Sequence, residues 1–217
     1  MEWNEDLAQR VCDTAHRLSE TGLVAGTSGN VSTFDREAGC VYITPSNARY
    51  DTMEPSDIMV IDLDGTILAG KTVPSSEWRL HTQIYRHMDE VNAVIHTHSP
   101  YATSFAVVGR EVPLILVEMV PFLGGGIPVA PFSFPGTDEV GLNAAKTLVE
   151  RHRNAALLKN HGVVAVGKTV EQTFLRAEYV EDASREYALA LAVGEPDLIA
   201  KDVEAALREK YHLPKED

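Results

Sequence analysis

The stretch AVIHTHSP, residues 93–100, carries most of the information about fold and chemistry in this chain. Its first part is rich in β-branched residues, which favours a short strand over 93–98. Side chains alternate between the two faces of a strand, so His96 and His98 project to the same side and could bind one metal ion. A helix is expected to open near Ser99 and Pro100. Two histidines at this spacing are, by themselves, equally compatible with a structural role.

A third histidine belongs to LLKNHG, residues 157–162. His161 lies at the exit of a predicted buried strand, directly before Gly162. Alone, such a histidine is more often a turn residue that hydrogen-bonds the backbone. Three imidazoles with one open position, however, are the ligand set of a catalytic zinc rather than a structural zinc. We therefore predict a metal centre formed by His96, His98 and His161.

The remaining histidines have simpler interpretations. His81 lies one turn after Glu77 on a helix predicted over 76–88, which leaves an indirect role beside the metal open. Ser75 or Ser76 is expected to cap that helix. Four others lie on charged, helical stretches and are expected at the surface: His16, His87, His152 and His212.

Length, composition and charge narrow the class of protein. The 217 residues suffice for one sizeable core, and no repeat or linker divides them, so we expect a single domain over 1–217. The net charge of −13 argues against nucleic acid or an anionic membrane as partner. No apolar run approaches the roughly 20 residues of a membrane span. Two cysteines and no signal-peptide pattern favour the cytoplasm.

Short strands and helices follow one another along the chain. Strands are expected after the glycine-rich turn 26–32, and over 41–44, 58–63, 66–69, 93–98, 155–159 and 163–167. Further helices are expected over 3–20, 137–152, 169–192 and 197–210. Strands joined by tight turns and flanked by helices predict an α/β fold with a mixed or antiparallel sheet covered by helices.

Taken together, the motifs resemble the class II aldolase and adducin-head family. In the family's order the chain has GTSGNVS (26–32), ITPSN (43–47), VPSSEWRLH (73–81), VIHTHSPYAT (94–103), IPVAPF (127–132) and LLKNHGVVAVG (157–167). The resemblance spans nearly the whole chain. It implies a three-layer α/β/α sandwich with a central mixed, largely antiparallel sheet, and a homotetramer whose active sites lie between subunits.

The resemblance also implies roles for individual residues. His96, His98 and His161 match the family's zinc ligands, and Co²⁺ or Mn²⁺ are alternatives because imidazole accepts several divalent ions. Glu77 matches the catalytic carboxylate, and Tyr211 matches a C-terminal tyrosine that closes over the site. The substrate and phosphate contacts correspond to Gly29, Asn30, Ser46, Asn47, Ser75 and Ser76. Glycine-flanked turns and a helix start offer N–H donors for a phosphate, although each cluster alone would be interpreted as a turn.

Two positions depart from the family's pattern. Asn47 replaces a usual glycine, and asparagine tolerates a left-handed backbone better than most residues. The L-fuculose-1-phosphate aldolases have a tyrosine that protonates the leaving group, whereas this chain has Val117 and Glu118 in that stretch. The group that serves the aldehyde oxygen is therefore Tyr211, Glu118 or a water. The apolar segment 114–126 is expected to be buried or at an interface.

The resemblance implies a zinc-dependent aldolase that cleaves a ketose 1-phosphate, like L-fuculose 1-phosphate, to dihydroxyacetone phosphate and an aldehyde by a retro-aldol reaction. Two enzymatic alternatives are a methylthioribulose-1-phosphate dehydratase, which keeps the glutamate, and an L-ribulose-5-phosphate 4-epimerase, which carries Asp at the position of Glu77. A third is a non-catalytic adducin-like module. Adducin-like chains lose the zinc residues, so the three histidines and Glu77 favour an enzyme.

Overall fold

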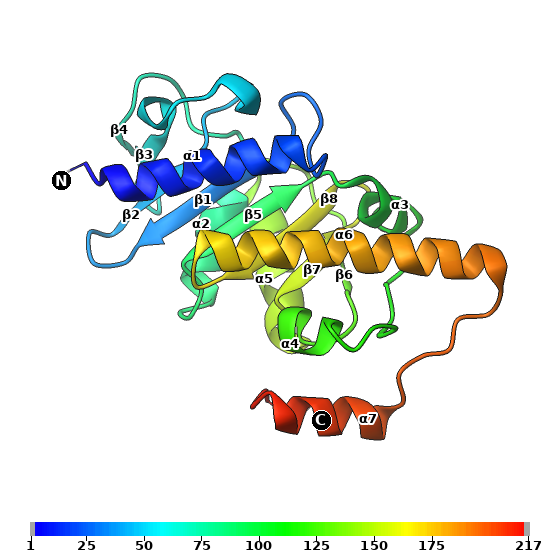
Figure 1. Cartoon of the computed structure of the whole chain (residues 1–217). Helices are drawn as coiled ribbons and strands as arrows, with labels where there is room; N and C mark the ends of the chain where they lie inside the picture. Colours follow the sequence, from blue (N-terminus) through cyan, green and yellow to red (C-terminus); the bar gives the residue numbers. More distant parts are fainter. Residues whose placement is uncertain (1–2, 215–217) are drawn as a thin grey trace.

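The computed structural model describes residues 3–214 (Figure 1). The helices are α1 (Glu5–Glu20), α2 (Trp78–His87), α3 (Pro100–Val108), α4 (Met119–Leu123), α5 (Asp138–Glu150), α6 (Val170–Val193) and α7 (Lys201–Lys210), with 3-10 turns η1 (Tyr50–Thr52) and η2 (Pro55–Asp57). The strands are β1 (Asn30–Asp35), β2 (Cys40–Ile43), β3 (Met59–Ile61), β4 (Ile67–Ala69), β5 (Ala93–Thr97), β6 (Val129–Ala130), β7 (Ala155–Leu158) and β8 (Gly162–Gly167).

The strands form one eight-stranded sheet in the order β4-β3-β2-β1-β5-β8-β7-β6. Among the described strands, β6 pairs with β7 in parallel and every other neighbouring pair is antiparallel. The predicted mixed, largely antiparallel sheet is therefore confirmed. β5, which carries the histidine pair motif, lies in the middle of the sheet between β1 and β8.

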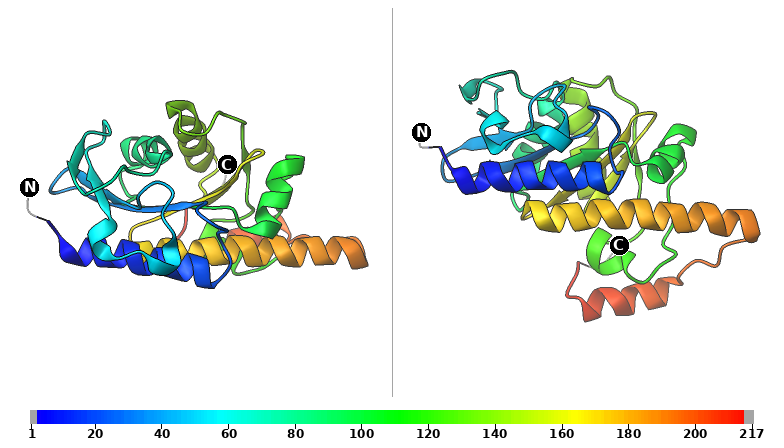
Figure 2. Two further views of the ribbon diagram at one scale, coloured as in Figure 1. Left: turned by 90° about the horizontal axis from the view of Figure 1, so that it is seen from above. Right: turned by 45° about the horizontal axis from the view of Figure 1, so that its top comes forward.

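Helices cover both faces of the sheet, and Figure 2 shows the three layers from above. α1 and α6 lie on one face and α2 and α5 on the other. The two cores follow the alternation of β5, because Ile95 packs in the first core and Val94 in the second. His96 shares the face of Val94, so it is directed toward the layer of α2 and α5. The predicted α/β/α sandwich is confirmed.

The register of the central strands determines which side chains lie next to His96. Asn30 at the start of β1 lies opposite His96, and Ser32 lies opposite Val94. Gly29 precedes β1 with φ of 78°, and a Cβ there would lie 2.8 Å from the carbonyl oxygen of His96. Only glycine therefore allows this turn to approach the end of β5 so closely.

Some local expectations were wrong. α2 begins at Trp78, two residues later than predicted, because Trp78 N–H donates to Ser75 O in a tight turn that leaves Glu77 as the N-cap residue. A short helix, α4, forms within the apolar segment 114–126, where no helix was predicted. That segment is only partly buried, since Val117 is 50% exposed. Along residues 3–214, no helix is long and apolar enough to cross a membrane.

Candidate active site

Four side chains from three segments meet at one end of β5. His96 is the penultimate residue of β5 and His98 directly follows the strand, while His161 lies in the turn between β7 and β8. Glu77 comes from the start of α2, on the layer toward which His96 points. One ligand-type atom of each lies within 4.8 Å of the others. The structure thus brings together all three predicted ligands and the predicted carboxylate.

The contacts show which atoms face the common centre. The Nε2 atoms of His96 and His98 lie 3.0 Å apart. The Glu77 carboxylate spans the gap, with Oε2 3.2 Å from His96 Nε2 and Oε1 3.1 Å from His161 Nε2. Two ligands of a tetrahedral zinc at roughly 2.0–2.1 Å lie about 3.3 Å from each other. The spacing of the imidazole nitrogens therefore suits one divalent ion.

Hydrogen bonding behind the histidines supports the same conclusion. His96 Nδ1 lies 2.8 Å from Val163 O, and a carbonyl only accepts, so Nδ1 carries a proton and Nε2 is directed at the centre. Glu77 Oε1 is buried, and its 3.1 Å contact with His161 Nε2 lacks hydrogen-bond geometry, so within residues 3–214 this oxygen has no well-aligned donor. A buried carboxylate oxygen without a donor is costly unless a cation compensates it. These residues fit a metal with three imidazole ligands and Glu77 beside it.

The charges of these groups are coupled. Burial raises the pKa of the Glu77 carboxyl, but the facing imidazoles of His96 and His161 outweigh this and hold the pKa far below its ordinary value. Burial lowers the pKa of His96, yet the Glu77 carboxylate outweighs it and leaves the pKa raised. Burial, with the neighbouring His96 and His161, lowers the pKa of His98 to about 4. Glu77 is thus an anion, and a proton on His96 is what a metal would replace.

Gly162 lets the histidines come together. A Cβ on this residue would lie 2.4 Å from Thr97 O, 3.1 Å from His96 Cε1 and 3.2 Å from His98 Cδ2. Contacts this short force the backbone or the imidazoles to move. The glycine after His161 is therefore needed for the spacing of the other two ligands.

The predicted phosphate residues lie on three loops next to Glu77. Ser46 N–H donates to Val73 O and Ser75 N–H donates to Thr44 O, both at 3.0 Å, so two of the loops are paired by these amides. Ser75 is buried and its Oγ accepts from Glu77 N–H at 3.3 Å, whereas Ser76 is exposed. The exposed Asn47 has φ of 55°, the left-handed conformation that its glycine-like position requires. The third loop, before β1, is fixed by Tyr50, whose hydroxyl donates to Gly29 O at 2.7 Å.

Asn30, a predicted substrate contact, lies directly against Glu77. Its side chain is buried, and Nδ2 donates to Glu77 Oε2 at 3.1 Å. On its other side Oδ1 contacts His81 Nε2. The role of His81 was left open by the sequence, and two further residues were not predicted: Ser32, which contacts His81, and Tyr85, which contacts Ser32. Their signal in the sequence is the four-residue spacing of Glu77, His81 and Tyr85 on one helix face.

Other predicted residues lie away from the cluster. Tyr211 follows α7, which packs against α4, and Figure 1 shows α7 apart from the strands that carry the histidines. Glu118 is exposed at the start of α4. One chain therefore does not bring Tyr211 to its own metal ligands. His87, His152 and His212 are exposed as predicted, whereas His16 is half-buried, with Nε2 2.8 Å from Met53 O.

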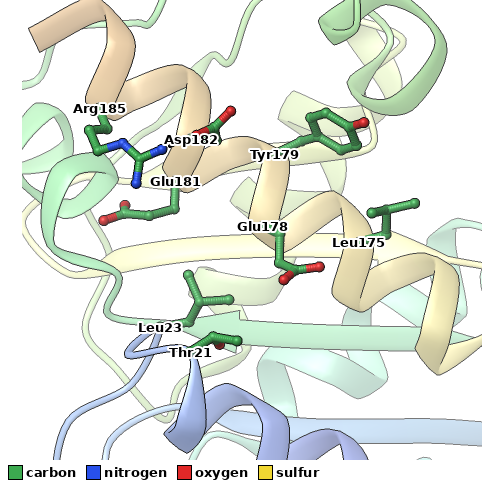
Figure 3. A pocket seen from close by; sticks show the side chains of 8 residues that line it. All are labelled: Thr21, Leu23, Leu175, Glu178, Tyr179, Glu181, Asp182 and Arg185. Carbon is green, nitrogen blue, oxygen red and sulfur yellow. Dashed lines mark hydrogen bonds and ion pairs between the residues drawn. The ribbon is translucent and has the colours of Figure 1, made fainter. Parts of the chain in front are cut away.

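A surface hollow of about 330 Å³ lies elsewhere, between α6 and residues 21–23 (Figure 3). Two of its acidic side chains have structural partners. Glu181 accepts from the N–H groups of Tyr101 and Ala102 and so caps α3, and Asp182 pairs with Arg185. Within residues 3–214, the group of side chains that could hold a metal ion is the one around Glu77 and not one in this hollow.

A three-layer α/β/α sandwich with three imidazoles and a carboxylate at one point defines a metal-dependent enzyme. Comparison with known proteins refines this class. A family model described as the Class II Aldolase and Adducin N-terminal domain matches residues 9–188. The chain therefore belongs to the class II aldolase and adducin family.

Similar proteins agree with this assignment. The 5-deoxy-D-ribulose 1-phosphate aldolase of Bacillus thuringiensis is 35% identical over 195 residues, which cover 90% of each chain. The L-fuculose phosphate aldolase of Escherichia coli K12 is 35% identical over 207 residues, 95% of this chain and 94% of the other. A solved structure of L-fuculose 1-phosphate aldolase superposes with a TM-score of 0.91 at 35% identity, covering 97% and 98% of the two chains. The chain is a class II aldolase, a metal-dependent lyase.

The raised pKa of His96 predicts how metal binding responds to pH. Metal and proton compete for His96 Nε2, so the affinity for Zn²⁺ should fall as the pH falls through the raised pKa of His96. One displaced proton corresponds to about a tenfold weaker affinity per pH unit below that pKa. Competition with a chromophoric chelator between about pH 5 and about pH 8 would measure the Zn²⁺ affinity at each pH.

Two variants serve as controls for this titration. His161→Ala should weaken Zn²⁺ binding at every pH, whereas His87→Ala, at an exposed histidine outside the cluster, should leave the curve unchanged. An affinity that does not vary with pH, or that is equal in both variants, would contradict the assignment of the ligands.

Proposed function

We propose that this enzyme cleaves a ketose 1-phosphate to dihydroxyacetone phosphate and an aldehyde, with Zn²⁺ bound by His96, His98 and His161. The observation that carries the proposal is the convergence of three imidazole Nε2 atoms and the Glu77 carboxylate at one point. The substrate class is supported by similar aldolases whose names specify 5-deoxy-D-ribulose 1-phosphate and L-fuculose phosphate.

The proposed reaction breaks the bond between C3 and C4 of the ketose. The bonding electrons stay with C3, the C4 hydroxyl loses its proton and becomes the aldehyde, and C3 gains a proton to complete dihydroxyacetone phosphate. A bound Zn²⁺ supplies Lewis-acid stabilisation of the negative charge on the substrate. Glu77 is placed to move the proton at C3, because it stands against the ligand cluster as an anion.

The phosphate is proposed to bind at the loops beside Glu77. Gly29, Ser46, Asn47, Ser75 and Ser76 lie on these loops, which cross-pair next to the start of α2. The amides of Ser46 and Ser75 already donate to backbone carbonyls, so the serine hydroxyls and the remaining N–H groups are the proposed donors. Asn30 is proposed to reach the substrate from beside Glu77, using the second hydrogen of its amide.

A substrate screen tests the function directly. The zinc-loaded protein would be incubated with ketose 1-phosphates, ketose 5-phosphates and the matching unphosphorylated ketoses, and the products identified. We expect dihydroxyacetone phosphate from 1-phosphates and far slower turnover of the unphosphorylated controls. A new ketose 5-phosphate would instead indicate an epimerase, loss of water a dehydratase, and no turnover an adducin-like module.

The role of Glu77 gives a separate prediction. Glu77→Gln preserves size and one acceptor oxygen, which can still accept from Asn30, but removes the charge and the basic oxygen, so turnover should fall by roughly 10²–10⁴-fold while the protein stays folded. Metal content measured on the same sample should remain near one ion per chain, because three imidazoles persist. Near-normal turnover would place the base elsewhere.

We further propose a homotetramer whose sites are shared between subunits, in the cytoplasm. The shared site is supported by the position of α7, which leaves Tyr211 exposed and apart from the ligand cluster of its own chain. Tyr211 from another subunit would then serve the aldehyde end of the substrate. The buried free thiols of Cys12 and Cys40 fit a reducing compartment.

Complementation tests the shared site. Glu77→Gln subunits would be mixed with subunits truncated before Tyr211, under conditions that allow subunit exchange. Mixed oligomers should regain activity that neither variant has alone, because one subunit supplies Glu77 and its neighbour supplies Tyr211. Mixing Glu77→Gln with His161→Ala is the matched control, since both changes affect the same cluster and should not complement. A fully active monomer would end this proposal.

A further inference from the structure

Four buried polar side chains continue inward from Glu77, away from the face where a substrate would bind. They are Asn30, His81, Ser32 and Tyr85, none more than 2% exposed. Asn30 and Ser32 are two residues apart on β1 and therefore lie on the same face of the strand. His81 and Tyr85 are one turn apart on the same side of α2, which packs against that face. The proposed catalysis through Glu77, His96, His98 and His161 does not explain why this row is polar.

The contacts form one unbranched chain. Glu77 Oε2 accepts from Asn30 Nδ2 at 3.1 Å, and Asn30 Oδ1 contacts His81 Nε2. His81 Nδ1 lies 2.6 Å from Ser32 Oγ. Ser32 Oγ lies 2.6 Å from the Tyr85 hydroxyl, where the chain ends.

The hydrogen bond from Asn30 Nδ2 to Glu77 Oε2 fixes the direction of every bond in this chain. A carboxylate only accepts, so Asn30 must present its NH₂ group to Glu77 and its oxygen to His81. His81 must then carry its proton on Nε2, which leaves Nδ1 as an acceptor. Ser32 must give its single hydroxyl proton to Nδ1, and it can receive one from Tyr85. Each hydrogen has one use, and reversing any link would set two acceptors against each other.

His81 is neutral, as this assignment requires. Burial, with the neighbouring His96, lowers the pKa of His81 to about 3. Burial raises the pKa of Tyr85, so its hydroxyl keeps its proton. A neutral imidazole can carry its proton on either nitrogen, and the hydroxyl of Ser32 selects Nε2 because it donates to Nδ1.

We propose that His81 is a positioning residue for catalysis: through the Nε2–H tautomer selected by Ser32 and Tyr85, it orients Asn30 so that the amide donates to Glu77 Oε2. This inference rests on the proposed role of Glu77. Without the donor at His81, Asn30 is free to turn its oxygen toward Glu77, and the carboxylate loses both its hydrogen bond and its fixed orientation. The metal ligands are untouched by this change, whereas the proposed contact between Asn30 and the substrate is disturbed together with the contact to Glu77.

The kinetic test compares two substitutions at one position in the zinc-loaded enzyme. His81→Leu removes both polar groups, whereas His81→Gln offers an N–H near Nε2 and an acceptor for Ser32. We expect His81→Leu to lower kcat roughly 10- to 100-fold, as loss of an outer hydrogen-bond partner at a metal site typically does. Metal content should stay near one ion per chain, kcat should fall by a larger factor than KM rises because Glu77 acts in the chemical step, and His81→Gln should recover most of the loss.

Smaller changes keep the test decisive if His81→Leu does not fold. Ser32→Ala should lower kcat in the same direction, because it removes the donor that selects the tautomer. Thr82→Val is the matched control, since Thr82 is buried on the same helix and its hydroxyl has no hydrogen-bond partner within residues 3–214. It should leave kcat unchanged. Equal losses in the His81→Leu and His81→Gln variants, or losses confined to KM or explained by metal content, would overturn the proposal.

A spectroscopic measurement separates this inference from the proposed reaction. Nitrogen-15 NMR of histidine-labelled, zinc-loaded protein should show His81 with a protonated Nε2 and an unprotonated Nδ1, and Ser32→Ala should disturb that state. If the enzyme turned over no ketose 1-phosphate, the proposed function would fail while this spectrum still tested the positioning of Asn30. A proton on Nδ1 in the unaltered protein would overturn the inference.

Discussion

The ionised carboxylate of Glu77, held almost out of water, is the constraint on which the rest of the site depends. Removing such a group from water costs several kcal/mol unless nearby groups compensate it. Compensation comes from three directions: His96 and His161 on the metal side and Asn30 on the inner side. Each of these neighbours is fixed by a regular element, since the β1–β5 register sets Asn30 beside His96 and the start of β8 follows His161. The central sheet and the start of α2 therefore form the rigid side of the active site.

Much of this could be predicted from the sequence, because it depends on local spacing. The alternation of a strand puts His96 and His98 on one face, and the apolar run before His161 indicates a buried strand that delivers a third ligand. What could not be predicted depends on pairing between distant segments. That Asn30 faces Glu77, and that Ser32 meets His81 and Tyr85, follows from the register of β1 against β5 and the packing of α2 on the sheet. No local pattern specifies that register. The late start of α2 was missed because a turn between Ser75 and Trp78 replaces the first predicted helical turn. The short α4 was missed because its five residues are too few to show a helical period.

The proposed chemistry involves two parts of the structure: the sheet with the start of α2, and the C-terminal segment. Metal ligands, Glu77 and the phosphate loops lie on the sheet and at the start of α2, where packing leaves little freedom. The groups for the aldehyde end are proposed to come from the C-terminal segment, which leaves α6, donates from Ile199 N–H to Leu114 O in the segment before α4, and packs α7 against α4. A shared core with variable outer parts would let one family act on sugars that differ beyond C4, in keeping with the different sugars in the names of the similar aldolases.

The central claim is that His96, His98 and His161 bind one divalent ion with Glu77 beside it. Crystals of the zinc-loaded protein, measured on both sides of the zinc absorption edge, test it most directly. We expect one anomalous peak per chain, with zinc–Nε2 distances of roughly 2.0–2.1 Å to His96, His98 and His161. A peak held by other residues, or zinc-saturated crystals with no peak at this cluster, would contradict it.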